Sequence, residues 1–595
     1  MSKWMVAAKK ADFYAIAQQY HISPVMARII RNRDVIEEAD IRKFLHGTRQ
    51  DLYAPDLLKD MDKAVDILLD KIAQNKQIRI IGDYDIDGVC STYILYKGLG
   101  KCGAKVDTAI PHRMKDGYGL NEHLIQEAYE AGADTVLTCD NGIAAFSQIE
   151  YANSLGMTVV VTDHHEVPYE EKDTERQYLI PPAAAVVDPK QQDCHYPFPE
   201  ICGAVVAYKL VLALTAKRQG VTWQQVMESD MGLELLEFAA FATIGDVMEL
   251  RDENRIIVSE GLNLMKHTRN IGLEALIRAT GTDAGHIKPY TVGFILGPCL
   301  NATGRLDTAD HALALFEAQD ESEAARIAGN LKAMNDSRKE LTLEGVEEAI
   351  AQIEEKQLCQ DDVLVVYLPD VHESLAGIIA GRIREKYNKP SFVLTRAEEG
   401  VKGSGRSIDA FHMYDEMTKC KQLFTKYGGH KLAAGVSMPE ENVEEFRRQL
   451  NANSHLTEDD FEEKVLIDVP MPISYASLEF VEELEKLEPF GNGNPKPLFA
   501  QKQVTFLKGR LLGQNQNVGK YTVADEDGRE FEMIYFGDIQ AFHEYLDQKF
   551  GIQAVERLYQ GRGREIVLSV AYYPDINEYN GIVSVQFRIE DWRYA

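Results

Sequence analysis

The chain is organised around residues 78–91, which read Ile-Arg-Ile-Ile-Gly-Asp-Tyr-Asp-Ile-Asp-Gly-Val-Cys-Ser. The first four residues form an almost continuous apolar run, which indicates a largely buried β-strand. Three carboxylates, Asp83, Asp85 and Asp87, follow at alternate positions, and an apolar segment with helical character comes after Gly88. Acids this close together repel one another unless a cation neutralises them. Because no basic residue stands among them, the stretch predicts a site for a hard divalent metal ion.

The same spacing matches the first half of a calcium loop of the EF-hand type. Such a loop has a helix in front of it and a bidentate Glu at its twelfth position. Counted from Asp83, the twelfth residue is Ile94, and an expected strand precedes the acids. Both differences disfavour the calcium loop. Three solvated acids in a turn without function remain the alternative for this motif alone.

Two further apolar runs end in acidic or imidazole side chains. They begin at residues 134–136 and 158–161 and end in Asp140-Asn141-Gly142 and Asp163-His164-His165-Glu166. The alternation of strands and helices predicts a parallel sheet with right-handed crossovers, which binds ligands beyond the carboxyl ends of its strands. Neighbouring strands lie about 4.8 Å apart, so these side chains can meet at one or two ions. A set of carboxylates and imidazoles suits Mn²⁺ or Mg²⁺ better than a thiolate-seeking metal.

The order of these motifs resembles that of a known family. Asp163-His164-His165 is similar to the signature of the DHH phosphoesterase superfamily, and the motifs at residues 83–88 and 140–142 resemble those of its RecJ family. The resemblance covers nearly the whole chain. It implies a metal-dependent exonuclease, specific for single-stranded DNA, that works from the 5′ end, releases 5′-mononucleotides and serves DNA repair and recombination. Two ions, Mn²⁺ or Mg²⁺, are implied to bind the scissile phosphate and activate a water molecule.

The resemblance also assigns residues to the site. It implies metal ligands at Asp85, Asp87, Asp140, His164 and Asp246, and catalytic roles for His165 and Asp83. We expect His165 to contact the phosphate as an electrophilic or acid partner, and Asp83 to support the ligands or share in binding. By its position alone, at the end of an apolar helical run, Asp246 would also suit a helix cap.

Four glycine-containing segments are expected to bind the substrate. They contribute Arg113, Asn301, Arg305, Ser404, Arg406, Gly429 and His430. Residues 297–306 read as a turn-rich loop and residues 402–407 as a short glycine loop, in which amides can approach a phosphate and arginine is a bidentate partner. Alone, the segment of Arg113 would equally suit an ordinary surface loop, and His430 a structural role. We predict that Ser404 and Arg406 anchor the 5′ phosphate, with Arg113 and Arg305 approaching it from the DHH domain if the two domains face each other as in the RecJ family.

The expected fold is a multidomain α/β protein. Its predicted parts are a helical leader packed on the DHH domain (residues 1–75), a parallel-sheet DHH catalytic domain (76–307), a long connecting helix (308–357), a smaller α/β DHHA1 domain that binds substrate (358–460), and a C-terminal β-barrel, an OB fold that binds DNA (461–595). The connecting helix is interpreted as a rigid spacer. Short alternating strands separated by turns predict the barrel.

Basic and aromatic residues alternate along the expected barrel. The basic residues are Lys502, Lys508, Arg510 and Lys520, and they alternate with Phe506 and Tyr521. OB folds hold single strands with basic groups beside exposed aromatic rings. A plain barrel with aromatic residues in its core is the alternative, and the resemblance favours DNA binding.

Composition sets limits on partners and location. The 595 residues carry a net charge of −30, which argues against binding nucleic acid through overall charge and requires a local basic groove. We expect no membrane span, because no apolar stretch reaches eighteen residues, and no signal peptide. Eight cysteines without a Cys-x-x-Cys pair suggest free thiols in a reducing cytoplasm. A monomer is expected, with single-stranded DNA as substrate and, from the resemblance, a single-strand-binding protein and a RecQ-type helicase as partners. The chain ends shortly after the barrel, so a further C-terminal partner domain is not expected.

Two other functions remain open. A DHH phosphodiesterase for short oligonucleotides or cyclic dinucleotides would resemble the first two domains only, and the barrel favours a polymer. A non-catalytic DNA-binding or replisome scaffold would lack metal ligands, whereas every expected ligand position is filled here. Superfamily members often carry His four residues before the Asp that matches Asp85. Because Ile81 occupies that place, the first-site geometry of the pyrophosphatase type is not implied.

Overall fold

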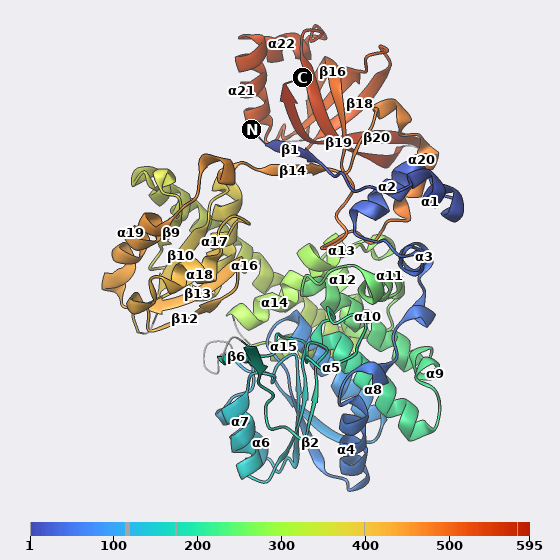
Figure 1. Ribbon diagram of the computed structural model, residues 1–595, viewed down its shortest axis with the longest axis vertical. Coiled ribbons are helices and arrows are strands. Elements are labelled where there is room, and N and C mark those ends of the chain that lie inside the picture. The colour runs from blue at the N-terminus through green and yellow to red at the C-terminus, as the bar shows by residue number, and fades with distance from the viewer. Residues whose placement is uncertain are drawn as a thin grey trace. The chain divides into compact units, whose positions relative to one another are not determined.

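The computed structural model describes residues 2–112, 119–172, 175–306, 308–397, 399–513, 515–579 and 581–594. The chain forms two compact units (Figure 1). The first comprises Met1–His46, Glu462–Phe490 and Asn494–Ala595, and the second comprises Gly47–Phe461 and Gly491–Gly493. In its described part, the chain has no helix that is both long and apolar enough to cross a membrane.

The second unit contains the predicted parallel sheet. Its five strands lie in the order β3-β2-β4-β5-β8, and every neighbouring pair is parallel. Their bounds are Gln77–Ile81 (β2), Lys105–Ala109 (β3), Thr135–Cys139 (β4), Thr158–Thr162 (β5) and Ala185–Val187 (β8). The central strands are buried on both faces, which explains why they read as continuous apolar runs.

Helices cover both faces of this sheet. They are α4 (Met61–Ala73), α5 (Ile86–Lys101), α6 (Glu122–Glu130), α7 (Phe146–Ser154) and α8 (Gly203–Gln219). Alternate residues of a strand point to opposite faces. Accordingly, Leu137 and Val160 share a core with α4, α5 and α8, whereas Val136 and Val159 share a core with α6 and α7. Figure 1 shows these two sets of helices on opposite sides of the strands. A small hairpin, β6 (Tyr169–Lys172) and β7 (Glu175–Tyr178), follows β5.

A helical region follows the sheet, and it corrects one prediction. Its helices are α9 (Trp223–Met227), α10 (Asp230–Gly245), α11 (Asp252–Met265), α12 (Ile271–Ala279), α13 (Pro289–Thr291), a π-helical turn (Val292–Leu296) and α14 (Gly297–Leu306). Residues 297–306, predicted as a loop, are therefore helical. Tertiary packing overrides the low helix propensity of glycine here, since a Cβ at Gly304 would lie 2.7 Å from the backbone oxygen of Tyr84. The π-helical turn ends two residues before Pro298, which cannot donate a backbone hydrogen bond.

Two helices and a second sheet complete this unit. The predicted connecting helix is divided into α15 (Asp310–Glu317) and α16 (Glu321–Glu355). The sheet has the order β12-β13-β11-β10-β9, with bounds Leu364–Tyr367 (β9), Ser391–Arg396 (β10), Val401–Arg406 (β11), Lys426–Gly429 (β12) and Ala433–Met438 (β13). Its helices are α17 (Ala376–Tyr387), α18 (Met413–Thr418) and α19 (Val443–Asn453).

The expected glycine loop at residues 402–407 is instead mostly strand β11. Its glycines permit close packing rather than flexibility. A Cβ at Gly403 would lie 2.1 Å from Leu394 Cδ2, and one at Gly405 would lie 2.5 Å from the sulfur of Met413. The glycine pattern of this strand therefore reflects steric fit within a central strand of the sheet.

The first unit contains the predicted barrel. Five strands close on themselves, since β16 pairs with both β17 and β19, and β15 extends the sheet beside β16. The strands are β15 (Val469–Pro470), β16 (Phe499–Leu512), β17 (Val518–Ala524), β18 (Glu530–Tyr535), β19 (Val567–Tyr579) and β20 (Ile582–Tyr594). The helices are α20 (Leu478–Glu485), α21 (Ile539–Phe550) and α22 (Ala554–Tyr559).

The N-terminal segment differs from the expected leader. Residues 1–46 form β1 (Lys3–Val6), α1 (Phe13–Tyr20), α2 (Pro24–Asn32) and α3 (Glu38–His46), and β1 pairs in parallel with β14 (Lys464–Ile467). Met26, Ile29 and Ile30 form an apolar stripe on α2 that packs in the barrel core. Only the remainder, with α4, packs on the parallel sheet.

The aromatic residues named for the barrel are core residues. Phe506 and Tyr521 are fully buried and pack edge to face against each other. Lys520 forms an ion pair with Glu532 at 2.5 Å. The two rings hold the barrel together and cannot stack on a nucleobase, so any binding by the barrel uses other side chains.

Candidate metal centre

The predicted acidic and imidazole residues gather at the carboxyl edge of the parallel sheet. Strand β2 pairs with β4, and β4 with β5, in registers that end at Ile81 beside Thr138 and at Cys139 beside Thr162. The loops that follow these three strands therefore begin side by side. This alignment brings together residues that lie far apart in the sequence, as expected for a parallel sheet.

The first loop begins α5. Asp85 is the N-cap of this helix, and its carboxylate accepts hydrogen bonds of 3.0 Å from the amides of Asp87 and Gly88. Asp83 is buried and accepts a hydrogen bond of 3.3 Å from the amide of Gly119. A Cβ at Gly88 would lie 2.3 Å from the backbone oxygen of Asp83, so the turn closes only around glycine.

Helix α8 holds the third acid of this loop. The amides of Gly203 and Ala204 donate to the two carboxylate oxygens of Asp87, at 2.7 and 2.8 Å. A Cβ at Gly203 would lie 2.8 Å from the Cβ of Asp140 and 3.0 Å from Oδ2 of Asp87. The close approach of α8 thus depends on glycine. The sequence analysis did not identify this role, although a glycine directly before a long apolar helix was a visible signal.

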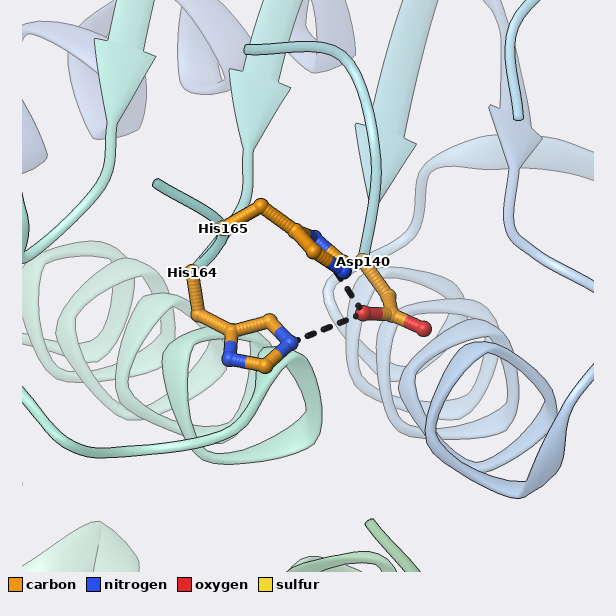
Figure 2. A group of neighbouring side chains, drawn as sticks. All are labelled: Asp140, His164 and His165. Carbon is orange, nitrogen blue, oxygen red and sulfur yellow. Dashed lines mark hydrogen bonds and ion pairs between the residues drawn. The ribbon is translucent and has the colours of Figure 1, made fainter. Parts of the chain in front are cut away.

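The second and third loops meet at Asp140 (Figure 2). His164 Nε2 lies 3.1 Å from Asp140 Oδ1, 3.5 Å from Asp87 Oδ2 and 3.8 Å from Asp246 Oδ2. His165 Nδ1 lies 3.9 Å from the same Asp140 oxygen. Asp246 arrives from the C-cap of α10. One imidazole nitrogen of His164 therefore faces three carboxylates at once.

Asp163, the first residue of the signature, orients its neighbours. It accepts hydrogen bonds from the amides of Ile143 and His164, at 2.9 and 2.8 Å, and lies 2.7 Å from His165 Nδ1. Burial tends to raise the pKa of this carboxyl, but the hydrogen bond and charge of His165 outweigh it, and the pKa is lowered. Asp163 had no predicted role. In the structure it is buried, and its carboxylate orients the imidazole of His165.

Burial and mutual repulsion raise the pKa of most carboxyl groups at this edge. The pKa of Asp83 rises to about 8 through burial and the charge of Asp85, and that of Asp246 to about 8 through burial and the charge of Asp87. The same causes raise the pKa of Asp85 and, most strongly, of Asp140. A bound cation would stabilise these carboxylates in their ionised form, because it offsets their mutual repulsion.

The two imidazoles have opposite electrostatic character. Burial lowers the pKa of His164, which favours the neutral form that a metal ion requires. Burial also acts to lower the pKa of His165, but the hydrogen bond and charge of Asp163 outweigh it and raise the pKa to about 9. Asp163 therefore favours the charged form of His165.

Among the described residues, three groups of side chains have the geometry of a metal site. They are Asp83, Asp85 and Asp140; Asp87, His164 and Asp246; and Asp140, His164 and His165. Within each group, the potential ligand atoms lie within 4.8 Å of one another. Asp140 and His164 each belong to two groups. The oxygen-rich donor set fits Mn²⁺ or Mg²⁺, and two ions could share Asp140.

The predicted substrate-binding residues are divided between two cavities and their surroundings. A cavity of about 470 Å³ is lined by Tyr84, Ser374, Lys402 and Ser404, among others. Arg305 donates a hydrogen bond of 2.9 Å to the backbone oxygen of Ser374. Arg406 lies against the start of α17, since a Cβ at Gly377 would be 2.9 Å from its Nη2. Both arginines thus approach the segment that begins α17.

A second cavity, of about 570 Å³, adjoins the imidazoles. Its lining includes His164, His165, Lys190 and His430. His430 and Ser404 therefore lie in different cavities. Gly429 ends β12 and does not line either of these two cavities.

Asn301 and Arg113 are the remaining predicted substrate-binding residues. Asn301 lies on α14, and its buried side-chain oxygen has no hydrogen-bond partner among the described residues. Arg113 lies outside the described residues. Asp188, which follows β8, was not assigned, yet it is buried and its pKa rises to about 8 through burial and the charge of Asp163. The sequence signal for Asp188 was a fourth apolar strand that, like β2, β4 and β5, is followed by an acid.

Comparison with known proteins places this arrangement in a family. Models of the DHH family N-terminal domain, the DHHA1 domain and the RecJ OB domain match residues 77–243, 360–454 and 467–591. The single-stranded-DNA-specific exonuclease RecJ of Escherichia coli is 31% identical, over 88% of this chain and 94% of that protein. RecJ of Bacillus subtilis is 36% identical over 89% of this chain, and the chain spans 65% of its length.

The fold is similar to that of solved RecJ structures. RecJ from Thermus thermophilus in complex with Mn²⁺ has a TM-score of 0.80 and 26% identity, covering 100% of this chain and 80% of that one. A second structure of that protein, with Mg²⁺, has a TM-score of 0.74, 25% identity and coverage of 100% and 78%. Sequence identity, domain order and fold agree, and the chain therefore belongs to the RecJ family of single-stranded-DNA-specific exonucleases.

Proposed function

We propose that this protein is a metal-dependent exodeoxyribonuclease that degrades single-stranded DNA from its 5′ end to 5′-mononucleotides, in DNA repair and recombination. The observation that carries the proposal is the position of Asp140. This residue joins an all-carboxylate group with Asp83 and Asp85 to His164, whose Nε2 also faces Asp87 and Asp246. Two cation sites that share one carboxylate are the arrangement that in-line hydrolysis of a phosphodiester requires.

Two Mn²⁺ or Mg²⁺ ions are the proposed cofactors. Asp85, Asp87, Asp140, His164 and Asp246 would hold them, with Asp83 supporting Asp85 and Asp140 or sharing in binding. When bound, such ions lower the pKa of a water molecule and neutralise charge on the scissile phosphate. The amides of α8 fix Asp87, so the chain itself sets the orientation of this ligand.

His165 is the proposed catalytic cation. Asp163 holds it in its charged form and fixes its orientation through a contact of 2.7 Å. Its side chain is 45% exposed, unlike that of His164, so it can contact a phosphate oxygen from the cavity side. A protonated imidazole there donates a hydrogen bond to the oxygen on which negative charge develops.

Ser404 and Arg406, with Arg305, are the proposed anchor of the 5′ phosphate, and the segment before α17 lies beside them. Arg305, Arg406 and Ser404 converge on it from α14 and β11. A terminal phosphate carries more negative charge than an internal diester, and arginine binds such a group through two parallel hydrogen bonds. Arg113 is proposed to approach the same phosphate from the DHH domain, and Asn301, Gly429 and His430 are proposed to contact the strand elsewhere.

The barrel is proposed to bind the strand as well, through side chains other than its buried rings. Lys502, Lys508 and Arg510 remain candidates on β16. The eight cysteines, all within the described part of the chain, are free thiols, which supports the proposed cytoplasmic location. A monomer, and contacts with a single-strand-binding protein and a RecQ-type helicase, are further proposals.

A substrate panel tests the function. With Mn²⁺, the protein should shorten a 5′-phosphorylated single strand, labelled at its 3′ end, one nucleotide at a time, and leave duplex DNA intact. Asp140→Ala should abolish cleavage. Asp283→Ala is the matched control, because this exposed acid bonds to Gly285 and His286 of its own turn. Activity confined to dinucleotides or cyclic dinucleotides would support a phosphodiesterase instead, and strand binding without cleavage would support a scaffold.

A further inference from the structure

Two aromatic rings lie exposed on the helical stretch that ends at α14. Tyr290, on α13, and Phe294, on the π-helical turn, stack with ring centroids 4.9 Å apart and an angle of 23° between their planes. Each residue is 66% exposed. Most aromatic pairs in this protein are buried core contacts, whereas this pair presents ring faces to water. Exposed, pre-stacked rings are the feature with which proteins bind unpaired nucleobases.

The backbone that carries the pair is packed against the metal centre. A Cβ at Gly293 would lie 3.7 Å from Ile244, and one at Gly297 would lie 3.0 Å from Cδ1 of Ile86. Ile244 stands two residues before Asp246, and Ile86 stands between two of the acids of the first loop. The backbone that carries the aromatic pair therefore packs against two segments that supply expected metal ligands.

The helical stretch also sets the distance between the aromatic pair and Arg305. It runs continuously from α13 to α14 and ends near Arg305, one of the residues proposed to hold the 5′ phosphate. Phe294 and Tyr290 lie about 16 and 22 Å from Arg305 along this axis, at 1.5 Å per residue. A stacked single strand advances about 3.4 Å per nucleotide, so bases about five to six nucleotides from the 5′ end would reach the rings.

We propose that Tyr290 and Phe294 form a stacking site for unpaired bases of the substrate, on the 3′ side of the bond that is cut. This inference rests on the proposed function. The ring faces accept any base, because every base has a π-face, but they exclude duplex DNA, whose bases are already stacked and paired. Stacking also requires no positive charge, which suits a protein with a net charge of −30.

The test compares strand lengths in the full-length enzyme. The variants are Tyr290→Ala/Phe294→Ala and, as an aromatic replacement, Tyr290→Trp/Phe294→Trp. The control is Tyr129→Ala, a change of another exposed tyrosine, on α6. The measured quantity is kcat/KM for a long 5′-phosphorylated strand divided by kcat/KM for a trinucleotide, which is too short to reach the rings. Loss of one stacked base should lower this ratio about five- to a hundredfold through KM in the alanine variant.

The aromatic variant should retain the ratio of the wild type, and the control variant should match it. A second measurement locates the site. The fluorescence of 2-aminopurine, placed at one position at a time in a strand bound to the Asp140→Ala protein, should be quenched most near the fifth and sixth nucleotides. This quenching should be lost when both rings are removed, which a purely structural role would not predict.

Each contrary outcome has a distinct meaning. An active wild type with an unchanged ratio in the alanine variant would overturn the stacking site and leave the proposed function intact. An unchanged ratio together with loss of self-association would assign the rings to an interface between copies of the chain. A wild type that cleaves no single strand would overturn the proposed function and this inference with it.

Discussion

Asn492→Ala is expected to weaken metal binding from outside the ligand set. Asp246 ends α10, and the next residue, Val247, adopts a left-handed conformation with φ of 57°. Its amide bonds to Ile244, and the amide of Met248 bonds to Thr243, each at 3.1 Å, which is the helix ending normally formed with glycine. A β-branched residue in this conformation costs about 1–2 kcal/mol. The backbone that positions Asp246 is therefore strained.

A short segment opposes this strain. The side-chain amide of Asn492 donates to the backbone oxygen of Val247 at 2.8 Å, and the amide of Leu250 donates to the backbone oxygen of Asn492 at 2.7 Å. Gly491 and Gly493 allow the close approach, since a Cβ on Gly491 would lie 2.7 Å from Leu250. Alanine at 492 removes only the side-chain bond. That loss of about 0.5–1.5 kcal/mol corresponds to a two- to twelvefold weaker affinity for Mn²⁺.

The loss of Mn²⁺ affinity caused by Asn492→Ala is expected to depend on Val247. Glycine adopts the left-handed conformation without a steric penalty, so Val247→Gly removes the strain that Asn492 opposes. In this background, Asn492→Ala should change the Mn²⁺ dissociation constant less than about twofold. Calorimetric titration of the four proteins gives the double-mutant cycle.

Asn153→Ala provides the matched control. Its side-chain amide also donates to a backbone oxygen, that of Pro182, at 2.8 Å, but from α7. This variant should bind Mn²⁺ as the wild type does. Equal losses from Asn492→Ala in both backgrounds, or no loss in either, would refute the idea that Asn492 acts by holding Val247.

Three further changes test packing and charge. Gly203→Ala should displace Asp87, cost about 1–3 kcal/mol of stability and lower Mn²⁺ affinity; unchanged calorimetric affinity would contradict the close packing. Asp468→Asn should cost about 3 kcal/mol in urea unfolding, because it leaves the buried cation of Arg33 without its anion, and a loss well below 1 kcal/mol would contradict this. Burial raises the pKa of Glu237 in the folded protein to about 7, so the folded state holds the proton of this group more tightly than the unfolded state does. The stability of the folded protein that this proton contributes is present below the unfolded pKa and is lost as pH rises through 7. Glu237→Gln should therefore match the wild type at pH 5 and exceed it at pH 8 by up to about 3 kcal/mol, and equal stability at both pH values would contradict the assignment.

The sheet and its edge could be predicted because both depend on local patterns. A strand buried on both faces must be apolar throughout, as in residues 135–139, and a parallel sheet places its loops at one edge. The acids and imidazoles at those strand ends were therefore predictable as one cluster. The contribution of Gly203 was not, because Asp87 and Asp140, which it approaches closely, lie 116 and 63 residues earlier in the sequence.

The errors share a physical cause. Glycine, proline and asparagine indicate turns when only local propensity acts. Residues 297–306 nevertheless form a helix and residues 402–406 a strand, in which glycines allow neighbouring backbone and side-chain atoms to pack closely. The stripe of Met26, Ile29 and Ile30 shows that one face of α2 is buried. It carries no information about whether the parallel sheet or the barrel covers that face.

The negative charge of the chain need not oppose a role on DNA. Acids concentrated at one sheet edge, such as Asp83, Asp140 and Asp246, belong to the proposed metal centre, where bound cations would offset them. The contacts proposed farther along the strand are arginines for the terminal phosphate and uncharged rings for the bases. A binding path built in this way depends less on overall charge than a basic groove does, and its affinity for single strands should fall less steeply with salt. The remaining acidic surface then disfavours duplex DNA, which offers phosphates but no free base faces.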